Sequence, residues 1–278
     1  DANGAGGEMT PNFGTRLRWW RERRGWSQLD LAGTADTSQR HLSFLESGRA
    51  EPSRDMVLRL SAALDLPLRQ QNALLLAAGF APAFRETSLS APELASVNRA
   101  LDHMLAQQEP FPAFVVDRRW NLLRANSGAG RLVEFLTGPA PVTAVPAPAV
   151  NLADALVSPD VLRPHIENWQ EVVLYFLRGV QADAVADGTQ ETAALLKRLL
   201  GYPDVPALST LPPAAEAPTP VLAIHFRKGT TSLRLFTTIA TLGTAHDVTL
   251  QEIRIECFFP ADPESERILR DWARARST

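Results

Sequence analysis

The sequence predicts two domains, an all-α N-terminal domain of five helices and an α+β C-terminal domain with an antiparallel sheet. The chain has 278 residues, more than one domain usually contains, and 45% of them are hydrophobic, enough to give each domain a core. Residues 13–80 combine helical spacing of apolar residues with capping and stop signals. Residues 92–278 alternate helical stretches with short β-prone runs, and residues 81–91 are predicted to be the linker.

The N-terminal domain should begin at Phe13, because residues 1–12 are mostly small and polar and are predicted to be disordered. Phe13, Leu17 and Trp20 mark the buried face of a first helix, which Gly25 ends. The later helices have equally clear limits: Ser27 with Asp30 makes a capping box for the second, Ser38 and Gly48 bound the third, Pro52 and Ser53 open the fourth, and Leu68–Ala78 is the fifth.

The C-terminal domain starts with an amphipathic helix through Leu94, Leu101 and Leu105. The predicted elements that follow are a β-hairpin (113–116 and 120–125), helices (127–136, 160–180 and 189–200), strands (221–226, 233–240 and 251–258) and a final helix from Pro263. Proline-rich stretches at 138–150 and 202–220 are predicted to be loops. In the last strand we expect Ile253, Ile255 and Cys257 to face the core and Glu252, Arg254 and Glu256 to face solvent.

Composition limits the class of protein. No apolar run approaches the roughly 18 residues of a membrane span, and the first residues do not resemble a secretion signal, so we expect a cytoplasmic protein with no membrane partner. The single cysteine, Cys257, excludes an internal disulfide framework and a thiolate metal cluster. The net charge of −3 is unevenly spread, because residues 13–85 hold 11 arginines against 7 acidic residues. The basic N-terminal end is therefore the expected partner of a polyanion.

The segment 26–52 places two short capped helices and a tight turn within the length that a helix-turn-helix requires. The runs Trp26–Ala32, Ser38–Gly48 and Glu51–Ser53 resemble the lambda-repressor-like, Xre-type helix-turn-helix family. The turn departs from the family pattern, since Asp36 stands where glycine is usual, but aspartate tolerates the left-handed conformation better than most residues. The resemblance implies binding to double-stranded operator DNA.

Helical spacing predicts which side chains of the third helix meet DNA. Leu42 and Leu45 must face the core, so the outward residues near the start of that helix are Ser38, Gln39, Arg40, Ser43 and Phe44. Glutamine pairs with adenine and arginine with guanine, and Phe44 is suited to a thymine methyl group. Gln28, Arg24 and Arg49 are expected to contact phosphates. The alternative is that these are ordinary exposed residues of a helical bundle.

A second resemblance covers most of the chain. Residues 52–82, the run Phe111–Asn126, the pairs Asn168-Trp169 and Leu177-Arg178, and His225 resemble the MmyB-like bacterial regulators. The resemblance implies that residues 92–278 form a PAS-like ligand-binding and dimerisation domain, in which five antiparallel strands are flanked by helices. It also implies a long-chain fatty acid or similar lipid between the sheet and the helices. The single helix-turn-helix per chain, with the small area that it can contact, predicts a homodimer.

Apolar residues compatible with such a site are Phe114, Leu122, Trp169, Val173 and Phe176. A filled hydrophobic core gives the same pattern. For a carboxylate head group the candidates are Arg124, Asn126, Asn168 and Arg178, because a buried anion needs hydrogen-bond donors. Asn126 has an alternative role as the cap of the helix that starts near Ser127.

An enzyme with a DNA-binding appendage is the rival class. The sequence has no metalloprotease, Walker, dinucleotide-binding or nucleophile-elbow motif, and its five histidines are scattered without ligand spacing. We therefore expect no catalytic residue, no metal and no cofactor, apart from a bound fatty acid. In a third interpretation the C-terminal domain only dimerises or binds a protein partner.

Overall fold

The computed structural model describes residues 12–139, 150–209 and 221–275. The predicted disorder of residues 1–12 and most of the two predicted proline-rich loops lie outside these ranges. The chain divides into two compact units. Unit 1 comprises Asp1–Glu86 together with His246–Gln251, and unit 2 comprises Thr87–Ala245 and Glu252–Thr278. The segment His246–Gln251, which we expected in the C-terminal domain, therefore lies with the N-terminal helices.

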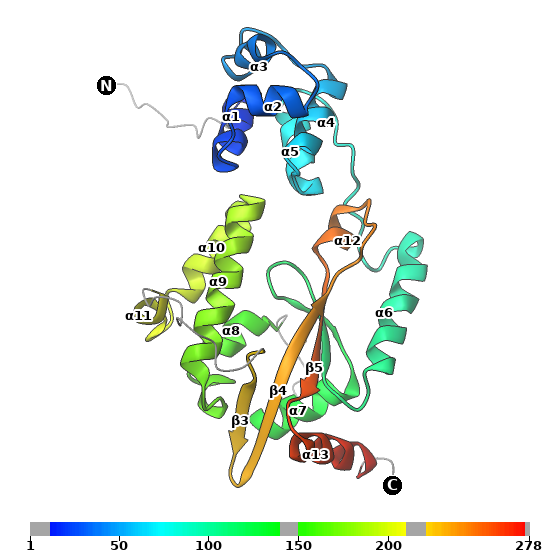
Figure 1. Ribbon diagram of the computed structural model, residues 1–278. Coiled ribbons are helices and arrows are strands. Elements are labelled where there is room, and N and C mark those ends of the chain that lie inside the picture. Colours follow the sequence, from blue (N-terminus) through cyan, green and yellow to red (C-terminus); the bar gives the residue numbers. More distant parts are fainter. Residues whose placement is uncertain (1–11, 140–149, 210–220, 276–278) are drawn as a thin grey trace, which may run out of the picture. The chain divides into compact units, whose positions relative to one another are not determined.

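Unit 1 is built on five helices within its described part (Figure 1). They are α1 Phe13–Arg23, α2 Gln28–Thr34, α3 Gln39–Glu46, α4 Arg54–Ala63 and α5 Leu68–Ala77. Ser27 and Asp30 form the predicted capping box, and Ser38 and Ser53 cap α3 and α4. Hydrogen bonds from Ser27 lower the pKa of Asp30. Local capping chemistry thus sets the helix boundaries.

The core of unit 1 consists of leucine-rich stripes from all five helices. Leu17, Leu31, Leu42 and Leu60 are completely buried in one cluster. The α2–α3 turn contains Asp36, whose φ of 49° confirms the left-handed conformation expected where the family has glycine. Gly14 permits close packing of α1 on α3, because a Cβ there would lie 2.5 Å from the carbonyl oxygen of Leu45.

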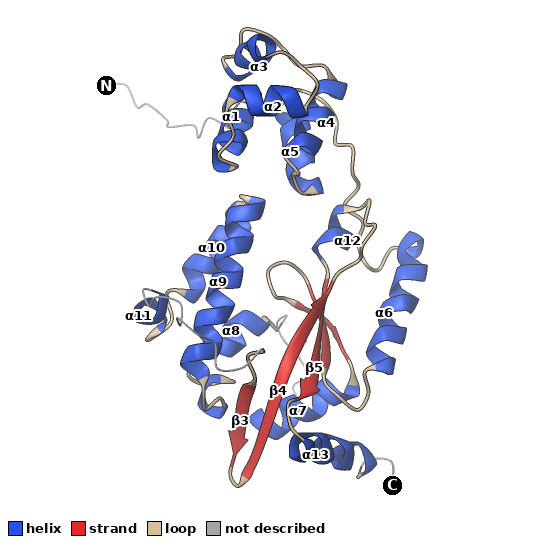
Figure 2. Ribbon diagram, viewed as in Figure 1, coloured by secondary structure: helices blue, strands red, loops and turns tan. Residues whose placement is uncertain are grey.

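Unit 2 has a five-stranded antiparallel sheet in the order β2-β1-β5-β4-β3 (Figure 2). Its strands are β1 Ala113–Val116, β2 Leu122–Ala125, β3 Ile224–Lys228, β4 Thr231–Ala240 and β5 Arg254–Pro260. The flanking helices are η1 Pro92–Leu94, α6 Ala95–Gln107, α7 Ser127–Thr137, α8 Leu152–Val157, η2 Arg163–His165, α9 Trp169–Asp187, α10 Gln190–Leu199, α11 Val205–Ser209 and α13 Pro263–Arg274. The short helix α12, Val248–Glu252, belongs to unit 1 except for its last residue. The predicted α+β class and its PAS-like arrangement of antiparallel strands between helices are confirmed.

The two faces of the sheet are covered by different helices. Along β1, Phe114 and Val116 belong to the main hydrophobic cluster, to which α7, α9, α10 and α13 also contribute. Val115 points to the opposite face, where its β2 partner Arg124 reaches α6. We call the first face the inner face and the second the α6 face, and Figure 1 shows α9 and α6 on opposite sides of the sheet.

Three local expectations were wrong. The second hairpin strand begins at Leu122, because Trp120 has a φ of 64° and cannot continue an extended strand. Residues 248–252 form α12 instead of the start of a strand. The side chains of Arg254 and Glu256 do not face solvent: β5 is a central strand, and both residues lie on the inner face opposite Val116 and Phe114. Alternation identifies two faces but does not tell which one is exposed.

Candidate nucleic-acid interface and ligand site

The third helix presents the predicted recognition surface. Leu42 and Leu45 are 0% and 1% exposed, whereas Gln39 and Arg40 in the first turn of α3 are exposed. Ser43 and Phe44 are partly buried, and the Arg40 guanidinium lies 5.4 Å from the centre of the Phe44 ring. This cation–π contact holds Arg40 along the outer side of α3, where it can reach a base edge.

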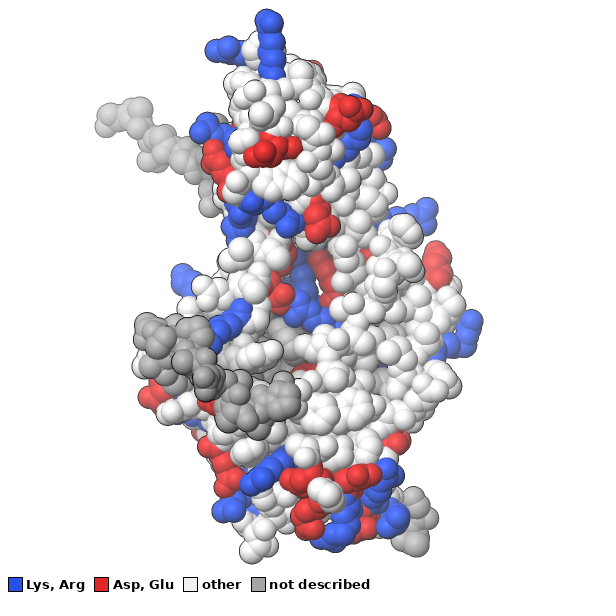
Figure 3. Space-filling model, viewed as in Figure 1, with Lys and Arg blue, Asp and Glu red and all other residues white. Residues whose placement is uncertain are grey.

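The start and the end of α3 carry further donors. The Ser38 side chain accepts a hydrogen bond from the His41 amide, so its hydroxyl hydrogen is available to a phosphate. Arg49, just after α3, is exposed. Figure 3 shows basic side chains projecting from the end of unit 1 where α3 lies. Exposed cations beside a helix N-terminus suit the phosphate backbone of DNA.

A buried ion pair fixes the position of α3. The Arg21 Nε and Nη2 atoms donate to the two Glu46 carboxylate oxygens at 2.6 and 2.9 Å, and both side chains are less than a tenth exposed. Gln28 Nε2 donates to the same carboxylate at 2.8 Å. Hydrogen bonding to Glu46 raises the pKa of Arg21. Gln28, predicted to contact a phosphate, thus connects α2 with α3 through Glu46.

Sequence reasoning missed the role of Arg21 and Glu46, although one signal was present. Arg21 follows Leu17 by four residues and therefore lies on the buried face of α1. Arg24, another predicted phosphate ligand, donates from Nη2 to the carbonyl oxygen of Asp65 at 2.8 Å. One of its donors therefore holds the turn between α4 and α5.

The predicted apolar ligand residues come together on the inner face. Phe114, Trp169 and Val173 are buried in the main cluster of unit 2, and Leu122 and Phe176 are partly buried against it. Trp169 Nε1 donates to the Leu156 carbonyl oxygen at 2.9 Å. These residues pack against one another, which is the geometry of a core and also of the wall of a site for an apolar molecule.

The predicted head-group donors do not converge. Arg124 lies on the α6 face and binds Asp102 Oδ1 at 2.5 Å and Asn98 Oδ1 at 2.6 Å, so it lies across the sheet from the apolar wall. Its assignment as a ligand for a head group on the inner face is therefore corrected. The irregular register between β1 and β2 at Val115 and Val116 places Arg124 and Leu122 on opposite faces of the sheet. Alternation along the sequence does not predict this irregularity.

The Asn126 amide is fully used within the protein. Its Oδ1 accepts from the Ala113 and Ala129 amides at 2.9 Å each, and its Nδ2 donates to the Leu105 and Phe111 carbonyl oxygens. Asn126 thus has the alternative role, the cap of α7, and also ties that helix to β1 and α6.

Asn168 and Arg178 both lie at or on α9. Asn168 accepts from the His225 amide at 2.9 Å and donates to the Ala223 carbonyl oxygen at 2.8 Å, which joins the start of α9 to β3. Asn168 and His225, which each contributed to the resemblance, therefore contact each other and have a structural role. Arg178 is partly buried.

Polar groups that the sequence did not indicate lie on the inner face. Arg254 Nη1 binds Asp183 Oδ2 of α9 at 2.7 Å, and its guanidinium lies 5.8 Å from the Trp120 ring centre. Burial of the Glu256 carboxyl raises its pKa to about 7, although Thr237 and Arg254 act in the opposite direction. Trp120 meets Phe176 edge to face at 4.8 Å. Arg254 and Glu256 were missed because β5 was assigned the wrong exposed face.

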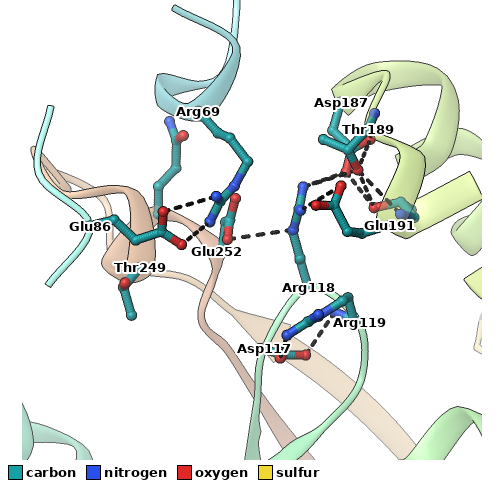
Figure 4. A network of polar contacts seen from close by, with 12 residues as sticks. Arg69, Glu86, Asp117, Arg118, Arg119, Asp187, Thr189, Glu191, Thr249 and Glu252 are labelled. Carbon is teal, nitrogen blue, oxygen red and sulfur yellow. Dashed lines mark hydrogen bonds and ion pairs between the residues drawn. The ribbon is translucent and has the colours of Figure 1, made fainter. Parts of the chain in front are cut away.

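A second polar network surrounds Arg118 in the β1–β2 turn (Figure 4). The guanidinium, 11% exposed, contacts Asp187 at 3.2 Å, Glu191 at 3.6 Å and Glu252 at 3.5 Å. It also donates to Thr189 Oγ1 at 3.1 Å. Arg118 therefore joins the connection between α9 and α10 to the end of α12.

The described residues also form a surface depression of about 430 Å³, whose lining differs from the predicted apolar wall. Its lining is mostly polar: Thr230, Thr231, Ser232, Glu264, Arg267, Ile268, Asp271 and Trp272. Arg267 is already paired with Glu264 and Asp271, so the depression has little to offer an apolar ligand. None of the predicted ligand residues lines it.

Two family models match the chain. A helix-turn-helix model covers residues 17–71, and the model of the MmyB-like transcription regulator ligand binding domain covers residues 97–271. The chain is thus a DNA-binding transcription regulator with a ligand-binding domain. Because the second match spans more than half of the chain, the protein belongs to the MmyB-like transcription regulators. One matched family is a helix-turn-helix domain and the other is a ligand-binding domain of transcription regulators.

No curated protein matches the sequence significantly. One solved structure, described as the structure of an RNA-binding Light-Oxygen-Voltage receptor, is 15% identical and has a TM-score of 0.25. The similarity covers 95% of this chain and 61% of that one. The chain therefore spans less than two thirds of the length of this structural neighbour.

The described residues contain neither a membrane-spanning helix nor a cluster of metal-binding side chains. Among the described residues, no helix has the length and apolarity needed to cross a membrane. The same part of the chain holds no group of three or more histidine, cysteine or acidic residues placed to share a metal ion.

Proposed function

We propose that this regulator binds a double-stranded operator as a homodimer in the bacterial cytoplasm, and that its C-terminal domain binds a fatty acid or similar acyl ligand. The observation that carries the proposal is the pairing of an exposed recognition surface on α3 with an apolar wall between α9 and the sheet. Both family matches support the general part of this proposal, regulation of transcription by a ligand-binding protein.

Operator recognition is assigned to the first turn of α3. Gln39 and Arg40 are exposed there, and the Arg21–Glu46 pair keeps the helix in a fixed position on α1. One helix-turn-helix contacts a small area of DNA, so useful affinity favours two copies on a two-fold-symmetric site. Half-sites should lie about 10 base pairs apart.

Selection of bound sequences from a random library, followed by sedimentation of the complex, tests the dimer. The expected result is a near-palindromic site that binds two chains. A single chain bound to one half-site with full affinity would contradict the homodimer.

The acyl ligand is assigned to the inner face because that face retains apolar surface. Leu122, Phe176 and Ile224 are only partly buried there, and Ile239, which pairs with Glu256 across β4 and β5, is 51% exposed. An alkyl chain lying along these residues would remove apolar area from water, at about 25 cal/mol per Å².

Titration of delipidated protein with straight-chain fatty acids, from octanoate to octadecanoate, tests the ligand class by calorimetry. We expect saturable binding whose affinity rises with chain length until the wall is filled. Absence of saturable binding at every length would favour the alternative, a C-terminal domain that only dimerises or binds a protein partner.

A further inference from the structure

One buried donor in unit 2 has no acceptor. The Trp120 side chain is 7% exposed, and its Nε1 hydrogen finds no acceptor among the residues that the structure describes. Buried polar groups are nearly always hydrogen-bonded, so an unpaired indole N–H calls for an explanation such as a ligand. Trp169 makes the contrast clear, since its Nε1 is also buried but donates to Leu156.

The surroundings of Trp120 combine an apolar wall with a cation. Its ring meets Phe176 of α9 edge to face, and Phe176 belongs to the predicted ligand wall. The Arg254 guanidinium lies 5.8 Å from the ring centre on the same side of the sheet. Among the described residues its ion-pair partner is Asp183, bound through Nη1, which leaves other donors of the planar fork.

The charges that face this point come from three elements. Asp183 belongs to α9, Arg254 and Glu256 belong to β5, and Thr237 of β4 hydrogen-bonds Glu256. Because burial raises the pKa of Glu256 to about 7, that carboxyl is largely neutral in weakly acidic solution and about half ionised at neutral pH. While Glu256 is neutral, the local environment contains one cation and one anion, and a second anion can be accepted without facing two ionised carboxylates.

We infer that the Trp120 indole N–H and the Arg254 guanidinium together bind the carboxylate of the acyl ligand, while its alkyl chain runs along Phe176 and the wall of α9. This inference rests on the proposed acyl ligand and names the head-group residues of the same site. It replaces Arg124, which lies on the other face of the sheet. Trp120 also has a positive φ of 64°, and strained residues are frequent at ligand sites.

The test compares Trp120→Phe with the wild type and with Trp272→Phe in the full-length protein. Phenylalanine keeps an aromatic ring but removes the N–H. Trp272 of α13 offers a matched control, because it packs against Phe135 of α7 and is not among the proposed ligand residues. Affinities are measured for the best-binding fatty acid and for the alcohol of equal length. We expect Trp120→Phe to weaken the acid about tenfold and the alcohol by less, since hydrogen bonds to an ionised acceptor are stronger. Trp272→Phe should match the wild type.

An NMR spectrum of the indole N–H groups of the wild-type protein provides a second test if Trp120→Phe folds poorly. The six tryptophans give six indole N–H signals, and replacing each of the other five by phenylalanine in turn assigns the signal of Trp120 by elimination. Fatty acid should move that signal downfield, as a new hydrogen bond does. Unchanged acid affinity in Trp120→Phe, or an unmoved Trp120 signal in saturated wild type, would overturn the assignment. Failure of the wild type to bind any fatty acid would instead remove the proposed ligand class.

Discussion

At the level of single side chains, the proposed recognition surface offers one arginine on α3 to the bases and another, beyond the end of α3, to the phosphate backbone. Arg40 is exposed in the first turn and is held along the helix by Phe44, whereas Arg49 is exposed beyond the helix end. The first position suits a base edge and the second a phosphate.

Arg40→Ala should therefore lose about 1–3 kcal/mol of operator binding and relax the preference at one base pair. Arg49→Ala is the matched control, because it should weaken all sequences alike and reduce the salt dependence. Arg24 is less suitable, since its guanidinium also holds the Asp65 carbonyl oxygen. Binding to a panel of operator variants at two salt concentrations distinguishes the effects. If Arg40→Ala preserves the ranking of the variants, the recognition surface lies elsewhere.

Glu256 gives a pH-dependent contribution to folding. Its pKa in the folded protein is about 7, above the ordinary value of 4.5, because burial disfavours the carboxylate despite Arg254 and Thr237. The folded state therefore binds the proton more tightly than the unfolded state does. The associated stability is fully present below about pH 4.5 and is lost as the pH rises through about 7, by an amount on the order of 3 kcal/mol.

Glu256→Gln removes this titration while keeping the shape of the side chain. Its free energy of unfolding should equal that of the wild type or fall below it at about pH 5, and should exceed it at about pH 8. Urea unfolding across this range measures the difference, with exposed Glu93→Gln as control. Parallel pH profiles for the wild type and Glu256→Gln would show that the carboxyl is not buried in solution.

At the level of whole elements, the helices of unit 1 were largely predictable and the faces of the sheet were not. Ser27, Ser38 and Ser53 cap helices through bonds to residues three positions ahead, so the sequence contains all the information. The orientation of Arg124 and Arg254 depends on strand pairing, register and the helices that cover each face. These are long-range features that a period of two residues does not encode.

The position of α3 depends on the Arg21–Glu46 pair, which joins helices that are distant in sequence. Glu46→Gln keeps the size of the side chain but leaves the Arg21 charge buried without its counterion. Loss of one partner from a buried pair costs about 3–5 kcal/mol, and we expect the upper end to be softened by the remaining amide oxygen. Urea unfolding of unit 1 gives the loss of stability, and operator affinity should fall with it.

Glu22→Gln is the matched control, because Glu22 bonds Arg18 on the surface of α1 and is the exposed, more distant partner of Arg21, 3.7 Å from its Nη2. Solvent and salt screen such an exposed pair, so stability should hardly change. Equal effects of Glu46→Gln and Glu22→Gln would mean that the buried pair does not fix α3.

At the level of the whole molecule, the connection between β4 and β5 belongs to both units. Its segment His246–Gln251 is part of unit 1, where the Val248 amide donates to the Arg85 carbonyl oxygen at 2.8 Å and Gln251 Oε1 accepts from the Leu68 amide at 2.8 Å. The next residue, Glu252, is part of unit 2 and contacts Arg118. The backbone between β4 and β5 therefore connects a strand of unit 2 directly to residues that pack within unit 1.

If the proposed acyl ligand regulates DNA binding, both it and the operator must bind one of two states of the protein more tightly than the other, because a ligand with equal affinity for both states shifts nothing. Linkage then demands that ligand change operator affinity by the same factor by which operator changes ligand affinity, typically about 5- to 150-fold. Arg118 is the residue best placed to carry this coupling. It joins Asp187 and Glu191, next to the ligand wall of α9, to Glu252 at the end of α12.

Arg118→Gln should bring the coupling factor close to one while the separate affinities for ligand and for operator change little. The neighbouring Arg119→Gln is the matched control, because Arg119 is 51% exposed and pairs only with Asp117 in the described structure, so its loss should preserve the coupling. Fatty acid titrations with and without operator, and operator titrations with and without fatty acid, measure the factor in both directions. Equal coupling in both variants and the wild type would exclude Arg118 as the link, because the contacts from α9 to α12 would then be broken without consequence for DNA binding.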